Sequence, residues 1–308
     1  MNPSRVRVLV PATTANLGPG FDCLGAALDL WNEVTFIKQG SQLKVEIYGE
    51  GAENVPTDQR NLVVKTFQQF CDLHHTPMPA GLRVICRNQI PLGSGLGSSA
   101  AAVLAGLVGA SKLLGISISA EQILELANQI EGHPDNAAAA LYGGLVISAA
   151  LDQGLFTRRY DLPDIPVAIA LGLIDLPTHA ARAALPKSIP FSDAVFNISR
   201  SLLVVDALRT GDLALLGQVM QDRLHQPFRL PLMPGAAEAI QAALDCGAEA
   251  ATISGAGPSM IAFTRGNPEP IAAAMQQAYQ SAGTPARAFS LRTTNLGTKV
   301  DCEGAGEE

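Results

Sequence analysis

Residues 91–102 read Pro91-Leu92-Gly93-Ser94-Gly95-Leu96-Gly97-Ser98-Ser99-Ala100-Ala101-Ala102. Three glycines alternate with other residues, two serines follow, and an apolar run with helix-forming character comes next. Glycine lets a backbone bend sharply and approach a ligand closely, because it has no Cβ. Loop amides at the start of a helix form a site for anions, and serine hydroxyls there can serve a phosphate-bound Mg²⁺. The stretch therefore predicts a loop that holds nucleotide phosphates between a strand and a helix.

Two better-known phosphate-binding loops do not match this stretch. The Walker A loop requires a lysine after its last glycine, and no lysine follows Gly97. The dinucleotide-binding loop requires two residues before its third glycine, whereas only Leu96 separates Gly95 from Gly97. The alternative is a glycine-rich turn that merely caps a packed helix, and the double serine and the preceding proline argue against it.

Composition limits the function classes that remain open. The 308 residues are 47% hydrophobic and only 16% charged, so the chain can bury a sizeable core, and we expect two domains. The net charge of -7 disfavours general nucleic-acid binding, although a few arginines suffice for ATP. Five scattered cysteines without a Cys-x-x-Cys pair favour reduced thiols in a cytoplasmic protein over zinc or disulfides. No apolar run reaches the roughly 18 residues of a membrane span, and no signal-peptide core follows Met1, so we expect no membrane partner.

The first half predicts a mixed α/β domain that spans residues 1–155. Pro11 is expected to end the first strand and to start a polar loop that reaches Asp22. Ser119 and Gln122 form the pattern of a capping box at the start of a helix. The expected strands are 6–10, 34–37 paired with 43–47, 82–86 and 145–149, and the expected helices are 61–73, 98–114 and 119–130.

The second half predicts a different architecture over residues 156–300. Its elements follow the order β-α-β-β-α-β of a ferredoxin-like unit, with extra helices in the first crossover. The expected strands are 167–173, 250–253, 260–264 and 287–291, and the expected helices are 193–208, 212–224, 236–244 and 271–282. Residues 301–308 form an acidic tail that we expect to fray. The fold class is therefore α+β.

Three further stretches concentrate polar chemistry. In residues 10–22, Asn16 and Asp22 stand on a glycine-punctuated loop, where they can contact a polar substrate or simply form turns. Residues 131–136 read Glu131-Gly132-His133-Pro134-Asp135-Asn136, and their carboxylates offer oxygen ligands for Mg²⁺. Pro134 is expected to stop the preceding helix, and a solvated loop is the alternative there. In residues 253–259, two glycines indicate a backbone that approaches another loop or a ligand, with a tight hairpin as the alternative.

In order and position, these four stretches resemble those of the GHMP small-molecule kinases, and within that superfamily the homoserine kinase branch. The resemblance covers nearly the whole chain. It implies an N-terminal ribosomal-S5-like α/β domain, a C-terminal ferredoxin-like domain, and an active site in the cleft between them. It also implies ATP-dependent phosphorylation of the side-chain hydroxyl of L-homoserine, which yields O-phospho-L-homoserine and ADP in threonine biosynthesis.

The resemblance also implies roles for individual residues. The loop from Pro91 to Ala101 would wrap the ATP phosphates, Asn61 would lie near adenine, and Ser99 and Glu131 would bind Mg²⁺. Arg182 could neutralise the homoserine carboxylate or the transferring phosphoryl group, and Arg229 is a second candidate for the carboxylate. The remaining residues expected on the homoserine side are Asn16, Asp22, His133, Asn136 and Thr178. His74, His75 and His225 lack such a context and are expected to be structural or solvated.

Phosphoryl transfer depends mainly on positioning and on neutralisation of charge, so the sequence does not identify a catalytic base. Asp135 is the candidate, but Asn136 is the alternative that faces the hydroxyl, and the proton could instead pass to the phosphate. A kinase for mevalonate, shikimate or a sugar is an alternative function, which Asp22 disfavours because it suits an ammonium group. A nucleotide-binding sensor without catalysis is another, which the presence of Ser99 and Glu131 disfavours. We also expect a homodimer, because homodimers are common among soluble enzymes.

Overall fold

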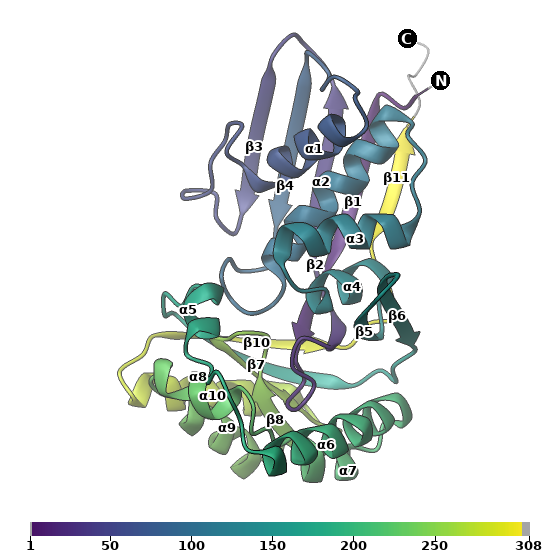
Figure 1. The fold of residues 1–308 in the computed structure, drawn as a ribbon. Coiled ribbons are helices and arrows are strands. Elements are labelled where there is room, and N and C mark those ends of the chain that lie inside the picture. Colours follow the sequence, from purple (N-terminus) through teal and green to yellow (C-terminus); the bar gives the residue numbers. More distant parts are fainter. Residues whose placement is uncertain (1, 304–308) are drawn as a thin grey trace.

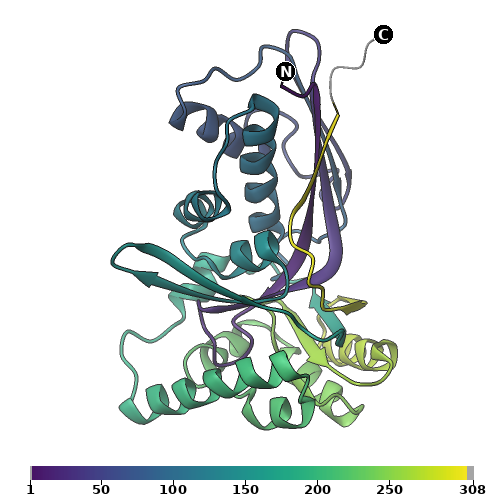
Figure 2. The same cartoon turned by 90° about the vertical axis from the view of Figure 1, so that its right-hand side faces the viewer.

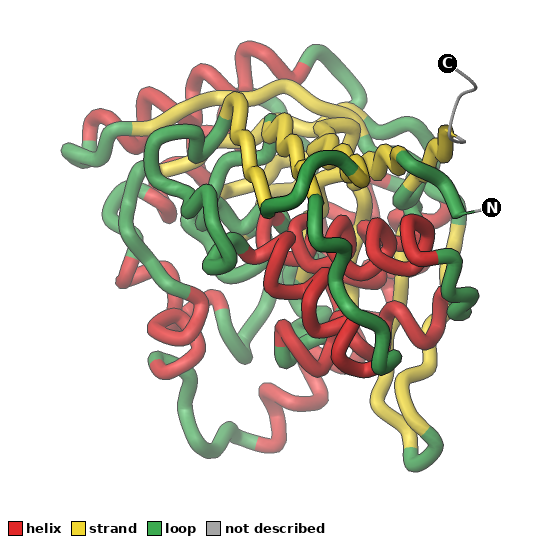
Figure 3. The backbone as a smooth tube through the Cα atoms, turned by 90° about the horizontal axis from the view of Figure 1, so that it is seen from above, coloured by secondary structure: helices red, strands yellow, loops and turns green. Residues whose placement is uncertain are grey.

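The computed structural model describes residues 2–303, which form two stacked α+β domains (Figure 1). The first domain is built on the strands β1 (Arg5–Ala15), β2 (Leu24–Lys38), β3 (Leu43–Gly49) and β4 (Leu82–Asn88). Its sheet has the order β11-β1-β2-β4-β3, and β5 (Leu145–Leu151) joins the start of β2. The hairpin of β5 and β6 (Gly154–Tyr160) projects from the body of the protein (Figure 2, Figure 3).

Four helices cover one face of this sheet (Figure 2). They are α1 (Leu62–Leu73), α2 (Ser98–Leu114), α3 (Ala120–Glu131) and α4 (Asp135–Tyr142). The expected helix from Ser98 to Leu114 is confirmed, and Gly115 ends it in a left-handed conformation. The expected capping box is also confirmed, because the Ser119 hydroxyl and the Gln122 side chain each bond the other's backbone N–H.

The strand pairing expected in the first domain is wrong. The β4 strand lies between β2 and β3, so residues 34–37 do not pair with residues 43–47. The β3 and β4 strands are parallel, and α1 crosses between them, since parallel neighbours need a long connection. Pro11 does not end the first strand either. The pairing register of β1 with β2 shifts between Pro11 and Ala12, and such an irregularity accommodates a proline inside a sheet.

The second domain has the predicted ferredoxin-like topology. Its strands are β7 (Pro166–Gly172), β8 (Ala250–Ile253), β9 (Ser259–Phe263) and β10 (Ala286–Arg292), and the antiparallel sheet has the order β10-β7-β9-β8. The helices α9 (Ala236–Asp245) and α10 (Pro268–Ser281) pack on this sheet. The first crossover also contains α5 (Thr178–Ala183), α6 (Phe191–Thr210), α7 (Leu213–Val219), α8 (Gln226–Arg229) and the 3₁₀ turn η1 (Leu230–Leu232). The helix expected over 212–224 is α7 and ends at Val219, five residues early.

The division between the domains differs from the expected one. Residue 155 lies inside the β5–β6 hairpin, which belongs to the first sheet. The chain also returns to that sheet at its end, because β11 (Lys299–Glu303) pairs with the beginning of β1. Residues 301–303 are therefore in a strand and not in a frayed tail, and residues 304–308 lie outside the described part of the chain. No helix within residues 2–303 is long and apolar enough to cross a membrane.

One hydrophobic core runs through both domains. It includes Phe36 and Leu104 from the first domain and Ile169 and Phe263 from the second, all fully buried. Burial of large apolar side chains contributes about 1.5 to 3 kcal/mol each, so a continuous core ties the two domains together. The loops at their junction are thereby held against one another, and they form the site described below.

Candidate active site

A cavity of about 310 Å³ lies between the two domains. It is formed where the ends of several elements meet, as polar loops gather at the edge of a packed core. The residues that line it and were singled out by sequence are Asn16, Asp22, Gly93, Ser94, Gly95, Gly97, Ser98, Ser99, Ala100, Glu131, His133, Asp135, Asn136, Thr178, Arg182 and Arg229. The structure therefore brings most of the predicted site residues into one space.

The glycine-rich loop connects β4 to α2, and its alternating glycines are required by its shape. Gly93, Gly95 and Gly97 have φ values of 59°, 75° and 76°, which L side chains rarely adopt. A Cβ at Gly95 would also meet the carbonyl of Ser254, and one at Gly97 would meet the hydroxyl of Thr13. The backbone thus passes closely over the end of β1 and over the loop between β8 and β9.

The first turn of α2 faces the same cavity without a side-chain cap. Gly97 stands at the N-cap position, and no side chain bonds the first amides of the helix. The N-terminus of a helix carries unpaired N–H groups and a partial positive charge, which suit a phosphate. The loop itself is held by Ser94, whose hydroxyl donates to the Pro91 carbonyl at 2.7 Å. Ser254 reaches it from the second domain and donates to the Gly95 carbonyl at 2.8 Å.

Ser99 and Glu131 form a hydrogen-bonded pair at the cavity wall. Ser99 lies in the first turn of α2 and Glu131 at the end of α3, and the Ser99 hydroxyl donates to Glu131 Oε1 at 2.6 Å. Within residues 2–303, no group of three or more His, Cys, Asp or Glu side chains could enclose a metal ion. Mg²⁺ bound with nucleotides usually takes only one or two protein oxygens and otherwise phosphate and water. The hydroxyl and carboxylate pair fits that limited donor set.

Asp135 is buried at the first turn of α4, beside the cavity. Its Oδ1 accepts from the Asn136 backbone N–H at 2.8 Å and bonds His133 Nδ1 at 2.9 Å. No hydrogen bond from the described residues reaches its Oδ2. The hydrogen bond to Asp135 raises the pKa of His133, which favours the charged imidazolium. Thr13 donates to Asn136 Oδ1 at 2.8 Å and so orients that amide.

Pro134 does not have the expected role. Gly132, in a left-handed conformation, ends α3, while Pro134 occupies the N-cap of α4. A proline is well suited to the start of a helix, because its missing N–H has no partner there. The short helix α4 escaped the sequence interpretation because its alanine-rich stretch carries no helical periodicity.

Asp22 and Arg182 are paired in the structure. Arg182 Nη1 and Nη2 each donate to one Asp22 carboxylate oxygen at 2.8 Å, and this bond raises the pKa of Arg182. The sequence interpretation treated them as separate contacts to a substrate. Asn16 is also engaged by the protein, because its Nδ2 donates to the Gly255 carbonyl at 2.6 Å and its Oδ1 accepts from the Asp22 N–H at 3.0 Å. Asn16 therefore shapes the loop that presents Asp22.

Asn61 lies outside this cavity. It caps α1, accepting from the Val63 N–H at 3.0 Å and donating to the Pro56 carbonyl at 2.9 Å. Together with the apolar side chains of Val63 and Leu92, it lines a second cavity of about 210 Å³ that also touches Ser98 and Ser99. This second space adjoins the glycine-rich loop and has the apolar lining that a planar base requires.

Arg229 is a buried cation that forms no ion pair with a carboxylate of the described residues. Only 1% of its surface is exposed, and its polar neighbours are the carbonyls of Ala181 and Gly255, both at 3.3 Å, and His225 Nδ1 at 3.5 Å. Burial, and then the charge of Arg182, lower the pKa of Arg229. A buried charge is costly unless an opposite charge compensates it, so this guanidinium favours an anion in the cavity.

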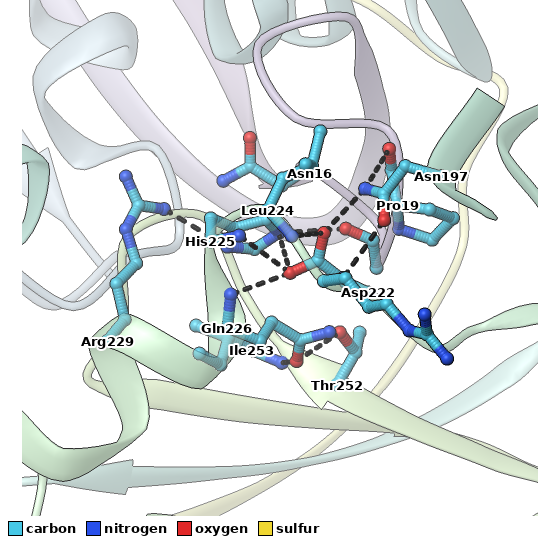
Figure 4. A network of polar contacts seen from close by, with 12 residues as sticks. Asn16, Pro19, Asn197, Asp222, Leu224, His225, Gln226, Arg229, Thr252 and Ile253 are labelled. Atoms are coloured by element: carbon cyan, nitrogen blue, oxygen red, sulfur yellow. Dashed lines mark hydrogen bonds and ion pairs between the residues drawn. The ribbon is translucent and has the colours of Figure 1, made fainter. Parts of the chain in front are cut away.

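The sequence indicated no role for His225 in the site. It was expected to be structural or solvated, and it is fully buried, next to Arg229 and to the loop that carries Asn16 and Pro19 (Figure 4). His225 is the N-cap residue of α8 and Arg229 is the last residue of that helix, so the spacing of four residues brings their side chains together. That spacing is the signal that could have marked His225.

Comparison with known proteins identifies the relatives of this chain. Residues 61–144 match the family described as GHMP kinases N terminal domain, and residues 204–281 match GHMP kinases C terminal. The homoserine kinase of Moorella thermoacetica is 43% identical over 295 residues, covering 95% of this chain and 99% of the relative. The homoserine kinase of a Synechococcus species is 43% identical over 304 residues, covering 97% and 99%. The crystal structure of homoserine kinase from Cytophaga hutchinsonii superposes with a TM-score of 0.85 at 30% identity, covering 97% of this chain and 98% of that one.

Proposed function

This chain belongs to the homoserine kinases of the GHMP kinase family, and we propose that it carries out their reaction in the cavity between its two domains. The reaction is ATP-dependent phosphorylation of the side-chain hydroxyl of L-homoserine, a step of threonine biosynthesis. The observation that supports this location is the lining of that cavity. It joins an uncapped helix N-terminus with its glycine-rich loop to a pocket that holds Arg182, Asp22 and Arg229.

We propose that the nucleotide occupies the side of the glycine-rich loop. The loop amides and the first turn of α2 would bind the phosphates, and the apolar cavity beside Asn61 would take the adenine. Kinases of this kind use ATP with a divalent metal, and we propose Mg²⁺, held by Ser99 and Glu131. The ion would supply positive charge to the phosphate oxygens as the transferred group loses its bond to ADP.

The acceptor would occupy the other side of the cavity. Arg229 suits the carboxylate of an amino acid, because it is buried and forms no ion pair with any carboxylate within residues 2–303. The Asp22–Arg182 pair suits the remaining polar groups, since its carboxylate can accept from an ammonium while Arg182 keeps a hydrogen bond. His133, Asn136 and Thr178 would border the hydroxyl.

In the transfer step, the acceptor oxygen forms a bond to the γ-phosphorus while the bond from that phosphorus to the bridging oxygen breaks. The electron pair of that bond leaves with ADP. We propose Asp135 as the group that takes the hydroxyl proton, because its Oδ2 has no hydrogen bond from the described residues. A phosphate oxygen is the competing acceptor, since a loose transition state needs little help from a base.

Two further attributes are proposals from composition. Five scattered cysteines support a cytoplasmic location, and the frequency of symmetric dimers among enzymes supports a homodimer.

The test of the function is ADP release by the purified chain with Mg²⁺ and ATP. Homoserine would be assayed beside mevalonate, shikimate, galactose, serine and threonine. Turnover restricted to homoserine supports the proposed acceptor pocket. Turnover with another alcohol alone would overturn the assignment of Asp22 and Arg229, and ATP binding without any turnover would overturn the proposed site as a whole.

A further inference from the structure

A network of polar side chains connects the turn before α8 with the loop that carries Asn16 and Pro19 (Figure 4). Its centre is Asp222, whose side chain is fully buried and accepts from Asn197 Nδ2 at 2.6 Å. The same carboxylate accepts from the backbone N–H groups of Leu224, His225 and Gln226 at 3.0, 2.9 and 2.6 Å. Asp222 therefore fixes the turn before α8, and with it the positions of the side chains that α8 presents.

His225 connects this turn to two parts of the acceptor site. Its Nε2 lies 2.8 Å from the Gly18 carbonyl, and its Nδ1 lies 3.5 Å from Nη1 of Arg229. A carbonyl can only accept, so Nε2 carries the proton, and Nδ1 of the neutral ring is then the acceptor for Arg229. The ring also stacks on Phe21, at 5.2 Å between centroids.

The loop that His225 contacts cannot hold its shape alone. Asn16, Leu17 and Gly18 have φ values of 68°, 45° and 71° in succession, and Asp22 has a φ of 56°. Non-glycine residues with such backbone conformations persist only where the surrounding structure holds them. The second domain provides that support, because Ser201 and Asn197 donate to the Pro19 carbonyl at 2.7 and 3.3 Å.

We propose that His225 is a positioning residue for the acceptor: by bonding Gly18 and Arg229 at once, it sets the spacing between the loop that presents Asp22 and the guanidinium that faces the cavity. This inference rests on the proposed function. None of the hydrogen bonds of His225 involves the glycine-rich loop, Ser99 or Glu131. Its loss should therefore weaken homoserine binding and leave the nucleotide side unchanged.

The protonation state of His225 supports the same role. Burial lowers its pKa, and the charged groups that face it are Asp222 from its own turn, Arg229 from α8 and Asp22 from the loop. Protonation would turn Nδ1 into a donor opposite the Arg229 cation, and the hydrogen bond between His225 and Arg229 would be lost. Acidification should raise the KM for homoserine before it changes the KM for ATP.

The experiment compares His225→Leu and His225→Gln with the intact chain, by measuring kcat and both KM values from pH 9 down to the lowest pH at which the intact chain stays folded. We expect His225→Leu to raise the KM for homoserine on the order of tenfold, the loss typical of one hydrogen bond, with the KM for ATP within twofold. His225→Gln should recover most of that loss, because its amide can donate to one partner and accept from the other. Its KM for homoserine should also lose the acidic rise seen in the intact chain.

The matched control is His74→Leu. The ring of His74 is tilted against that of Phe70 in the first domain, with 4.4 Å between the ring centroids, and His74 does not line the cavity. Its loss should therefore alter the thermal midpoint and neither KM. An unchanged KM for homoserine in folded His225→Leu, or equal rises in both KM values, would overturn the inference alone. If His225→Leu does not fold, a wild-type pH profile without an acidic rise in the KM for homoserine would overturn it. Absence of homoserine turnover by the intact chain would overturn the proposed function as well.

Discussion

Arg182 and Asp22 are 160 residues apart in the chain, yet both carboxylate oxygens of Asp22 lie 2.8 Å from the guanidinium of Arg182. This pair joins α5 of the second domain to a loop of the first and borders the cavity between them. Its carboxylate is therefore compensated by the protein before any substrate binds. An amino acid that enters the pocket therefore meets an Asp22 carboxylate that is already bonded to Arg182, and not an unpaired carboxylate.

The first prediction concerns the geometry of that pair. Arg182→Lys keeps the charge but cannot donate two parallel hydrogen bonds, so we expect the KM for homoserine to rise on the order of tenfold. The KM for ATP should stay within twofold. The control is Arg209→Lys, which alters an exposed pair with Asp206 on α6. A wild-type KM for homoserine in Arg182→Lys would remove the pair from the acceptor site.

The second prediction concerns the metal. Ser99→Ala and Glu131→Gln each remove one of two adjacent oxygen donors, so we expect half-maximal activity to need roughly tenfold more Mg²⁺. Steady-state rates measured over a range of free Mg²⁺ concentration check this. Glu121→Gln, in the first turn of the same helix α3, is the control. If neither variant shifts the Mg²⁺ dependence, the ion is held elsewhere.

The third prediction separates the two fates of the hydroxyl proton. If Asp135 is the base, Asp135→Asn should lower kcat on the order of a hundredfold, because an amide of the same shape cannot take a proton. We expect this result, with a wild-type fold by circular dichroism, since Asn can still bond the backbone N–H of Asn136. Near-normal turnover in Asp135→Asn would rule out an Asp135 base and leave the phosphate as proton acceptor.

The fourth prediction tests the shape of the glycine-rich loop. Gly97→Ala adds a Cβ that meets the Thr13 hydroxyl and places alanine at a φ of 76°, so ATP binding should weaken at least tenfold. Gly247→Ala is a matched control, because Gly247 has a φ of 93° but nothing within 4 Å of the added atom. Both variants incur roughly 1 to 2 kcal/mol of backbone strain, and only Gly97→Ala adds the clash. Equal nucleotide affinity in the two variants would contradict the close approach seen here.

The fifth prediction is a pH dependence of stability. Burial lowers the pKa of His225 in the folded chain below its unfolded value of about 6.5. Between those two values the unfolded chain binds more protons, so the free energy of unfolding falls as the pH falls below about 6.5. One such group contributes a slope of at most about 1.4 kcal/mol per pH unit. The hydrogen bond to Asp135 raises the pKa of His133, which therefore acts in the opposite sense and stabilises the fold at low pH.

Urea unfolding of the intact chain and of His225→Gln at pH 5.5, 6.5 and 7.5 isolates this contribution. We expect the stability advantage of the intact chain to be largest at pH 7.5 and to narrow toward pH 5.5. A constant difference across this range would show that the pKa of His225 is the same in the folded and the unfolded chain, and would contradict the lowered pKa.

Local patterns predicted much of the fold. The start of α3 at the capping box of Ser119 and Gln122, and the end of α2 at Gly115, depend on contacts within a few residues. The sequence therefore predicted both helix ends correctly. The sequence did not predict the strand pairing, because β3 and β4 become neighbours only when α1 packs across them. The final strand β11 carried no local signal, since an acidic segment pairs with β1 only where that sheet edge is available.

By itself, the sequence determined the chemistry available to this protein: an alternating glycine loop before a helix, a hydroxyl and a carboxylate for a cation, and arginines for anions. These depend on residue type and short spacing, which local backbone rules govern. The tertiary structure alone decided which of them meet. The pairing of Asp22 with Arg182 and the contact of His225 with the Gly18 carbonyl arise from the packing of the two domains against each other. Contacts between segments 160 or more residues apart follow from that packing, and no local pattern encodes them.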